Sequence, residues 1–189
     1  MQYLKPNRLL PVLAILLMIA VPAMAGDDHR NGNNFHARLI GYQEVPAVST
    51  EATGEFHAVI SSDQQRIDWT LTYSGLQADA TQAHVHFAQR SVNGGIVIWL
   101  CQTASTAGNN AGPAAATCGA RSGSFSGTAL AANVVAITGA NAPQQIAAGE
   151  LAEVIAAIRA GVAYANVHTT VSPGGEIRGQ IRGGRGDDD

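Results

Sequence analysis

Short segments in which apolar and polar residues alternate are the feature that most limits how this chain can fold. Residues 67–74 show the pattern most clearly, with apolar side chains at Ile67, Trp69, Leu71 and Tyr73. Successive side chains of a β-strand point to opposite faces of a sheet, so this alternation predicts a half-buried strand. Further strands are predicted, by alternation or by a short apolar run, over residues 35–41, 54–61, 83–86, 96–101, 123–130, 162–170 and 176–182.

One segment breaks the alternation. Between Ile146 and Ala160 the apolar residues recur at helical spacing, two glutamates lie near its start, and Gly161 follows its end. These are the signals of a single helix, predicted over about residues 147–160. About eight short strands and one helix predict an all-β domain, built as an antiparallel sandwich or barrel.

The two ends of the chain differ from this middle. Residues 1–25 combine a positive start, a short apolar run and the small-x-small sequence Ala23-Met24-Ala25, which together predict a cleaved signal peptide. Residues 26–34 are predicted to be a flexible N-terminus, residues 35–182 the folded domain and residues 183–189 an acidic tail. We therefore expect a secreted or periplasmic protein with no membrane span after signal cleavage.

Charge narrows the classes of partner. The chain carries 11 basic and 14 acidic residues, for a formal net charge of −3. Every basic residue after the predicted signal peptide is an arginine, and the arginines form no run. This acidic, scattered pattern argues against nucleic acid or anionic lipid as a partner.

The chain contains two cysteines, Cys101 and Cys118. Disulfides persist in the compartments to which a signal peptide directs a protein, so we expect these two cysteines to be bridged. By chain entropy, closing a loop of this length contributes about 3 kcal/mol to stability. A pair of metal-binding thiolates is the weaker alternative, because the chain offers no third cysteine.

Residues 83–86, with the sequence Ala-His-Val-His, place two imidazoles on one face of a predicted strand. His168 lies on another predicted strand. Neutral imidazoles are ligands for copper and zinc, and three protein nitrogens leave a coordination position open. The predicted ligands of a transition-metal ion are His84, His86 and His168, with His57 or His36 as a possible additional ligand.

Polar residues near His168 leave a second interpretation open. A hairpin register that pairs His168 with Arg178 puts these polar residues on the face that carries the histidine. They could orient the rings of metal ligands, or they could simply hydrogen-bond the three histidines, with no metal present. Arg178 counts against a divalent ion, because a fixed positive charge beside it raises its cost. The surrounding residues in question are Asn166, Glu176, Arg178 and Gln180.

Three blocks of sequence follow one another along the chain: residues 39–46 with 52–54, residues 71–76 with 83–86 and 93–97, and residues 163–169 with 173–181. Together, in this order, they resemble the CHRD domain, a family named for repeats in the animal protein chordin. The resemblance implies an all-β domain and runs from about Phe35 to Arg182. Phe87-Ala88-Gln89 and Cys101 resemble a bacterial subgroup of exported single-domain proteins.

Three classes of function follow from these observations. The first, which we favour, is an exported, non-enzymatic binding module of the CHRD type, in which the three histidines are a candidate site for copper or zinc. The second is an adhesion or matrix module that meets an unknown extracellular protein through its surface, with a structural histidine network. The third is a copper-dependent redox enzyme of the superoxide dismutase type, although the chain lacks the further histidines and aspartate of a bimetallic site.

Overall fold

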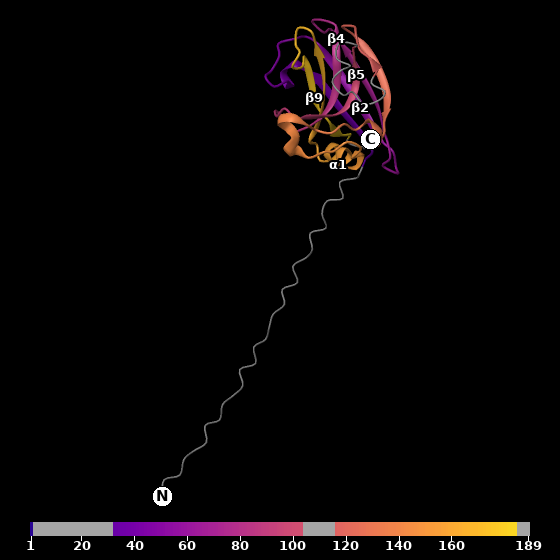
Figure 1. The fold of residues 1–189 in the computed structure, drawn as a ribbon. Coiled ribbons are helices and arrows are strands. Elements are labelled where there is room, and N and C mark those ends of the chain that lie inside the picture. The colour runs from indigo at the N-terminus through magenta and orange to yellow at the C-terminus, as the bar shows by residue number, and fades with distance from the viewer. Residues whose placement is uncertain (2–31, 104–115, 185–189) are drawn as a thin grey trace, which may run out of the picture. The chain divides into compact units, whose positions relative to one another are not determined.

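The computed structural model describes Met1, residues 32–103 and residues 116–184 of the chain. The predicted signal peptide beyond Met1, residues 26–31 and residues 185–189 of the predicted tail lie outside the described residues. Within the described residues, no helix is both long enough and apolar enough to cross a membrane. The described domain is mostly β, with its strands curled around one interior (Figure 1).

Ten strands form one sheet. In chain order they are β1 (Asn34–Ile40), β2 (Thr53–Ile60), β3 (Ile67–Ser74), β4 (Ala80–Phe87), β5 (Gly95–Gln102), β6 (Ala116–Thr117), β7 (Gly123–Ala129), β8 (Ala163–Thr169), β9 (Ile177–Gln180) and β10 (Arg182–Gly183). The helices are α1 (Leu151–Arg159) and three short 3-10 turns, η1 (Gly41–Gln43), η2 (Ala131–Asn133) and η3 (Gly139–Gln144).

The sheet curls until it is nearly closed. Its strand order is β6-β5-β4-β8-β9-β1-β2-β3-β7, and β10 pairs with β1. Near the two ends, Ile98 of β5 bridges to Val134, which follows β7 and η2, and the Val135 N–H donates to the Val97 carbonyl at 3.0 Å. The predicted all-β fold with one helix is confirmed as a barrel-like sheet. The sheet is mixed, because β5 and β6 are parallel while the other pairs are antiparallel.

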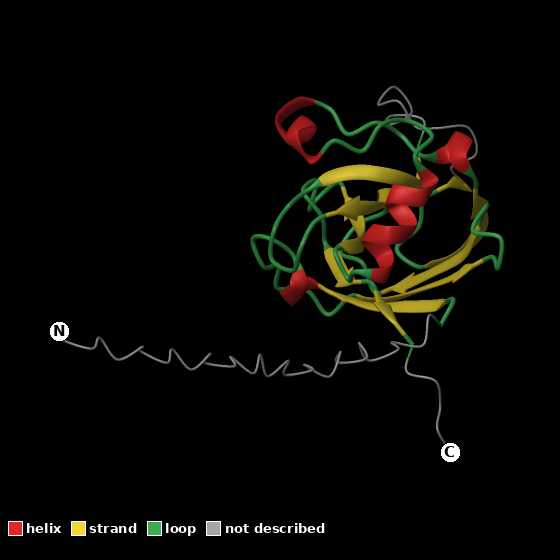
Figure 2. Ribbon diagram, turned by 90° about the horizontal axis from the view of Figure 1, so that it is seen from below, coloured by secondary structure: helices red, strands yellow, loops and turns green. Residues whose placement is uncertain are grey.

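The apolar core fills the inner face of this sheet. In β1, β2 and β3, buried and exposed residues largely alternate, as period-two patterning requires. The core includes Leu39, Phe56 and Leu71, whose neighbours along each strand face outward. Helix α1 lies across one end of the barrel that the curled sheet forms (Figure 2). It contributes apolar residues such as Val154 and Ile155 to the same core.

Strand β8 departs from the alternation, because all seven of its residues are buried. Its inward residues, Ala163, Ala165 and Val167, belong to the apolar core. The outward residues between them are Tyr164, Asn166 and His168, and these are covered too. The outer face of the sheet at β8 is therefore a second buried region, and it is polar.

The helix and the last strands differ from their predicted limits. The helix begins at Leu151 rather than near residue 147, because Gly149 has a φ of 87° and the Glu150 carboxylate accepts a hydrogen bond from the Ala147 N–H at 2.7 Å. These residues form a turn before the helix. The strand predicted over 176–182 is divided into β9 and β10, and β6 and β10 of two residues each raise the strand count from about eight to ten.

The register of the β8–β9 hairpin differs from the prediction by two residues. Asn166, not His168, is opposite Arg178, and Gln180 is opposite Tyr164. The β8–β9 pairing ends at Val167 opposite Ile177, where the Glu176 N–H donates to the Val167 carbonyl, and residues 170–176 connect the two strands. A shift of two residues preserves the face of every side chain, so the polar residues still share the outer face.

Cys101 and Cys118 form the predicted disulfide, with their Cα atoms 5.2 Å apart. Cys101 lies on β5 and Cys118 follows β6, and both are buried against the core. The bridge holds the short parallel pair β5–β6 at the end of the sheet.

Replacing both cysteines, in Cys101→Ser with Cys118→Ser, is expected to lower the free energy of unfolding by about 3 kcal/mol, because the unfolded chain gains the entropy of an open loop. Urea unfolding followed by circular dichroism measures the change. The wild-type protein unfolded under reducing conditions serves as the control and should show the same loss. A change below about 1 kcal/mol in both would contradict the stabilising role of the bridge.

Candidate metal centre

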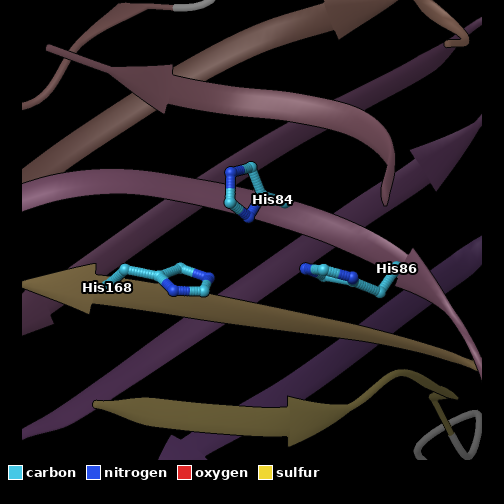
Figure 3. Close-up of side chains that lie close together, drawn as sticks. All are labelled: His84, His86 and His168. Atoms are coloured by element: carbon cyan, nitrogen blue, oxygen red, sulfur yellow. The ribbon is translucent and has the colours of Figure 1, made fainter. Parts of the chain in front are cut away.

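Three histidines converge on the covered outer face of the sheet. His84 and His86 lie on β4, and His168 lies on the neighbouring antiparallel strand β8. His168 is opposite Gln82, which places it diagonally across from His84. One ring nitrogen from each histidine can be chosen so that all three lie within 4.8 Å of one another, and the three rings lie close together in Figure 3. The predicted meeting of these imidazoles is therefore present.

The three rings are removed from solvent. His84 is 1% exposed, His86 is 8% exposed and His168 is 6% exposed. Ring centroids lie 5.3 Å apart for His84 and His86 and 4.9 Å apart for His84 and His168. Against β5, strand β4 carries register irregularities on both sides of His84 and Val85, so the histidine strand is not a regular ladder.

Two of the rings are fixed by backbone carbonyls. The Nδ1 atom of His86 is 2.9 Å from the Gly94 carbonyl oxygen, and Nδ1 of His168 is 2.9 Å from the Pro173 carbonyl oxygen. A carbonyl oxygen can only accept, so Nδ1 carries the proton in both neutral rings and donates it. Nε2 is then left with a free lone pair. This hydrogen-bonding pattern is the usual one for histidines that bind metals.

The ring of His84 packs against an aromatic side chain. Its ring lies edge-on to the indole of Trp99, with the centroids 4.3 Å apart and an interplanar angle of 86°. Neither of its ring nitrogens has a hydrogen-bond partner among the described residues, and the same is true of Nε2 in His86 and in His168. Each unpaired buried polar atom costs about 1–3 kcal/mol. Four such nitrogens gathered in one cluster fit a bound ion.

Burial also keeps the imidazoles neutral. Loss of solvation lowers the pKa of His84 well below its ordinary value, and the charges of His168 and His86 would lower it further. Burial likewise lowers the pKa of His86 to about 3 and lowers the pKa of His168. Near pH 7 all three rings are therefore in the unprotonated form that can coordinate a metal.

Of the polar residues predicted around the histidines, Asn166 interacts through its side chain with His84 and His86, whereas Arg178 and Gln180 hold a loop. Arg178 donates to the Asn93 side-chain oxygen at 3.2 Å, to the Gln89 carbonyl at 3.3 Å and to the Val92 carbonyl at 2.9 Å. Gln180 donates to the Ala88 carbonyl at 3.0 Å. The segment 88–94, which supplies the carbonyl that fixes His86, is therefore held down from β9.

Glu176 is directed elsewhere. Its carboxylate accepts hydrogen bonds from the Thr50 and Thr169 hydroxyls at 2.9 Å and 2.8 Å and from the Gln77 N–H at 2.9 Å. It joins the loops after β1 and β3 to the end of β8. Asn166 lies between His84 of β4 and Arg178 of β9 in the sheet register.

His36 and His57 are placed apart from the cluster. They face each other across β1 and β2, and both side chains are exposed. In the strand order, β9 and β8 separate β1 from β4. The structure therefore does not bring either of these histidines to the other three.

Two aromatic neighbours of the site are not among the predicted site residues. Tyr164 stacks on His86 with ring centroids 4.6 Å apart and an interplanar angle of 1°, and Trp99 packs on His84. Tyr164 shares the period-two face of Asn166 and His168, so the alternation of β8 contains a signal for it. The sequence contains no such signal for the carbonyl groups of Gly94 and Pro173, because every residue has a backbone carbonyl.

A cleft of about 640 Å³ lies beside the histidines. His86 and Trp99 line it, together with apolar residues of the segment after β7, including Val134 and Ile137. The cleft therefore borders the cluster at the ring of His86.

A family model matches most of the chain. The family model described as CHRD domain matches residues 35–181 of the chain, which includes all three histidines. Comparison with curated proteins and with solved structures found no match.

The metal-free protein is expected to lose stability as the pH falls below about 6.5. Unfolded histidines take up a proton near that pH, whereas the folded rings, with pKa lowered to about 3 in His86, do not. The free energy of unfolding should then fall by about 1.4 kcal/mol per pH unit for each histidine over the pH range in which its folded ring stays unprotonated. Glu44, whose pKa burial raises to about 7, acts in the opposite sense for one proton and offsets only part of this.

Urea unfolding at pH values between 7 and 4.5 measures the effect. Stability is greatest above the ordinary histidine pKa and declines steadily through the window below it. A free energy of unfolding that stays constant between pH 6.5 and pH 4.5 would contradict the burial of neutral imidazoles.

Proposed function

The chain belongs to the CHRD domain family, and on that premise we propose that it is an exported, non-enzymatic module that binds one copper or zinc ion through His84, His86 and His168. The observation that carries the proposal is the set of buried ring nitrogens without hydrogen-bond partners. The CHRD match itself names no ligand, so the proposal rests on the side chains of this chain.

The donor set suits such an ion. Nitrogen ligands lie about 2.0–2.1 Å from zinc, so three nitrogens that share an ion stand about 3.5 Å apart. The histidine nitrogens lie within 4.8 Å of one another, so binding would draw the rings together by up to about 1 Å. Three neutral imidazoles would leave one coordination position for water or another small ligand.

The hydrogen bonds favour this proposal over a purely structural histidine network. In such a network the rings would be bonded to Glu176, Arg178 or Gln180. The bonds that these residues make instead go to loop carbonyls, hydroxyls and amides, while two rings bond to backbone carbonyls. The buried disulfide suits an extracytoplasmic location, as expected for an exported member of the bacterial subgroup.

A redox enzyme of the superoxide dismutase type is the second candidate, and the cleft beside His86 and Trp99 is the observation that favours it. A copper ion in the cluster would be within reach of a small substrate that entered this cleft. Turnover of superoxide by the copper-loaded wild-type protein, lost in His84→Ala, would overturn the non-enzymatic part of the proposal.

Calorimetric titration with Zn(II) is expected to show one ion bound per chain, and removal of one histidine ligand should weaken the binding. Both His84→Ala and His168→Ala should lower the affinity at least a hundredfold, because each removes one of three nitrogens. His57→Ala, which changes an exposed histidine outside the cluster, is the matched control and should bind as the wild type does. Equal binding by all four proteins would reject the site.

His84→Leu separates a ligand from a structural residue. Because His84 makes no hydrogen bond, leucine of similar size removes two unpaired polar atoms, and the metal-free protein should be as stable as the wild type or up to about 2 kcal/mol more stable. Thr169→Val, which breaks a buried hydrogen bond to Glu176, is the control and should destabilise by about 1–3 kcal/mol. Urea unfolding compares the two, and a large loss of stability in His84→Leu would indicate a structural role.

A further inference from the structure

We infer that the histidine site selects a monovalent ion, Cu(I), over divalent copper and zinc, and that the buried guanidinium of Arg178 is the residue that sets this preference. The inference rests on the proposed metal site and specifies the charge of its ion. Its basis is a fixed positive charge that the fold places beside a set of neutral ligands.

The positive charge reaches the site through a stack of three side chains. The Cζ atom of Arg178 lies 3.4 Å from the ring centroid of Tyr164, and that ring is parallel to the ring of His86 at 4.6 Å. Tyr164 is on β8, which lies between β4 with His86 and β9 with Arg178. The aromatic ring therefore separates the guanidinium from a metal ligand and excludes water between them.

The groups that hydrogen-bond the guanidinium of Arg178 carry no charge. Arg178 is 1% exposed, and its hydrogen bonds go to two carbonyl oxygens and one amide oxygen, all neutral. An arginine side chain stays protonated in proteins. Glu44 is the buried carboxyl group that acts on Arg178 electrostatically, and burial raises the pKa of Glu44 to about 7, so it balances the guanidinium only in part.

The ligands contribute no negative charge. His84, His86 and His168 are neutral imidazoles, and the cluster includes no carboxylate or thiolate among the described residues. An ion bound to the His86 ring would lie on the order of 10 Å from the guanidinium. At an effective dielectric constant of about 20, the repulsion between two unit charges at that distance lowers the affinity for the ion about tenfold. The repulsion energy is twice as large for a divalent ion as for a monovalent ion. The preference for Cu(I) should therefore include about one factor of ten from Arg178.

The chain offers a mild way to neutralise this charge. Asn93 is exposed, and its side-chain oxygen already accepts a hydrogen bond from Arg178 at 3.2 Å. Asn93→Asp places a carboxylate of nearly the same shape on the guanidinium without touching a histidine, although it removes the hydrogen bond that Asn93 Nδ2 donates to the Val45 carbonyl at 3.0 Å. Asn34→Asp, at the exposed start of β1, makes the same change of net charge at a distance from the site.

Competition with chromophoric chelators under anaerobic conditions measures the affinity of the full chain for Cu(I) and for Zn(II). Ag(I) serves as a second monovalent probe that undergoes no redox change. In Asn93→Asp, the affinity for Zn(II) should rise about tenfold relative to that for Cu(I) and Ag(I), whereas Asn34→Asp should match the wild type. Arg178→Gln should shift the ratio in the same direction, and Arg178→Lys should keep the wild-type ratio because it keeps the charge.

Two results would overturn the inference while leaving the metal site intact. One is a Zn(II) to Cu(I) ratio that Asn93→Asp changes by less than twofold. The other is a wild-type protein that binds Cu(II) more tightly than Cu(I). Failure of the wild type to bind Cu(I), Ag(I), Zn(II) or Cu(II) would instead reject the proposed metal site, and the inference with it.

Discussion

Burial of the outer face of β8 is the constraint on which the candidate site depends. A sheet curled into a barrel needs only its inner face to be covered, and β1 to β3 follow that rule with exposed outer residues. At β8 the segment 88–94 and the loop before β9 cover the outer face as well. The low dielectric environment that results keeps the imidazoles neutral and makes the charge of Arg178 felt across a stacked ring.

The segment 88–94 links these effects. It accepts hydrogen bonds from Arg178 and Gln180 of β9, and the carbonyl of Gly94 accepts a hydrogen bond from Nδ1 of His86. Gly94 has no room for a side chain, since a Cβ atom there would overlap the Phe87 carbonyl. The position of one ring of the candidate metal site thus depends on backbone that is anchored from another strand.

Period-two patterning contained most of the fold and the three converging histidines. His84 and His86 share a face because they are two residues apart. By the same rule, His168 could be assigned to the polar face of β8. The hairpin register could not be fixed in this way, because a slip of two residues leaves every side chain on its face. Backbone carbonyl partners, the stacking of Tyr164 and the closure of the sheet near Ile98 depend on tertiary contacts that no local pattern encodes.

Alternate residues of β8 face two different buried regions. Ala163, Ala165 and Val167 pack into the apolar interior, while Tyr164, Asn166 and His168 face the covered polar region. Substitutions on one set leave the packing of the other largely untouched, because neighbouring side chains point in opposite directions. The side chains around the candidate site can therefore be varied at alternate positions of β8 without changing a residue of the apolar interior.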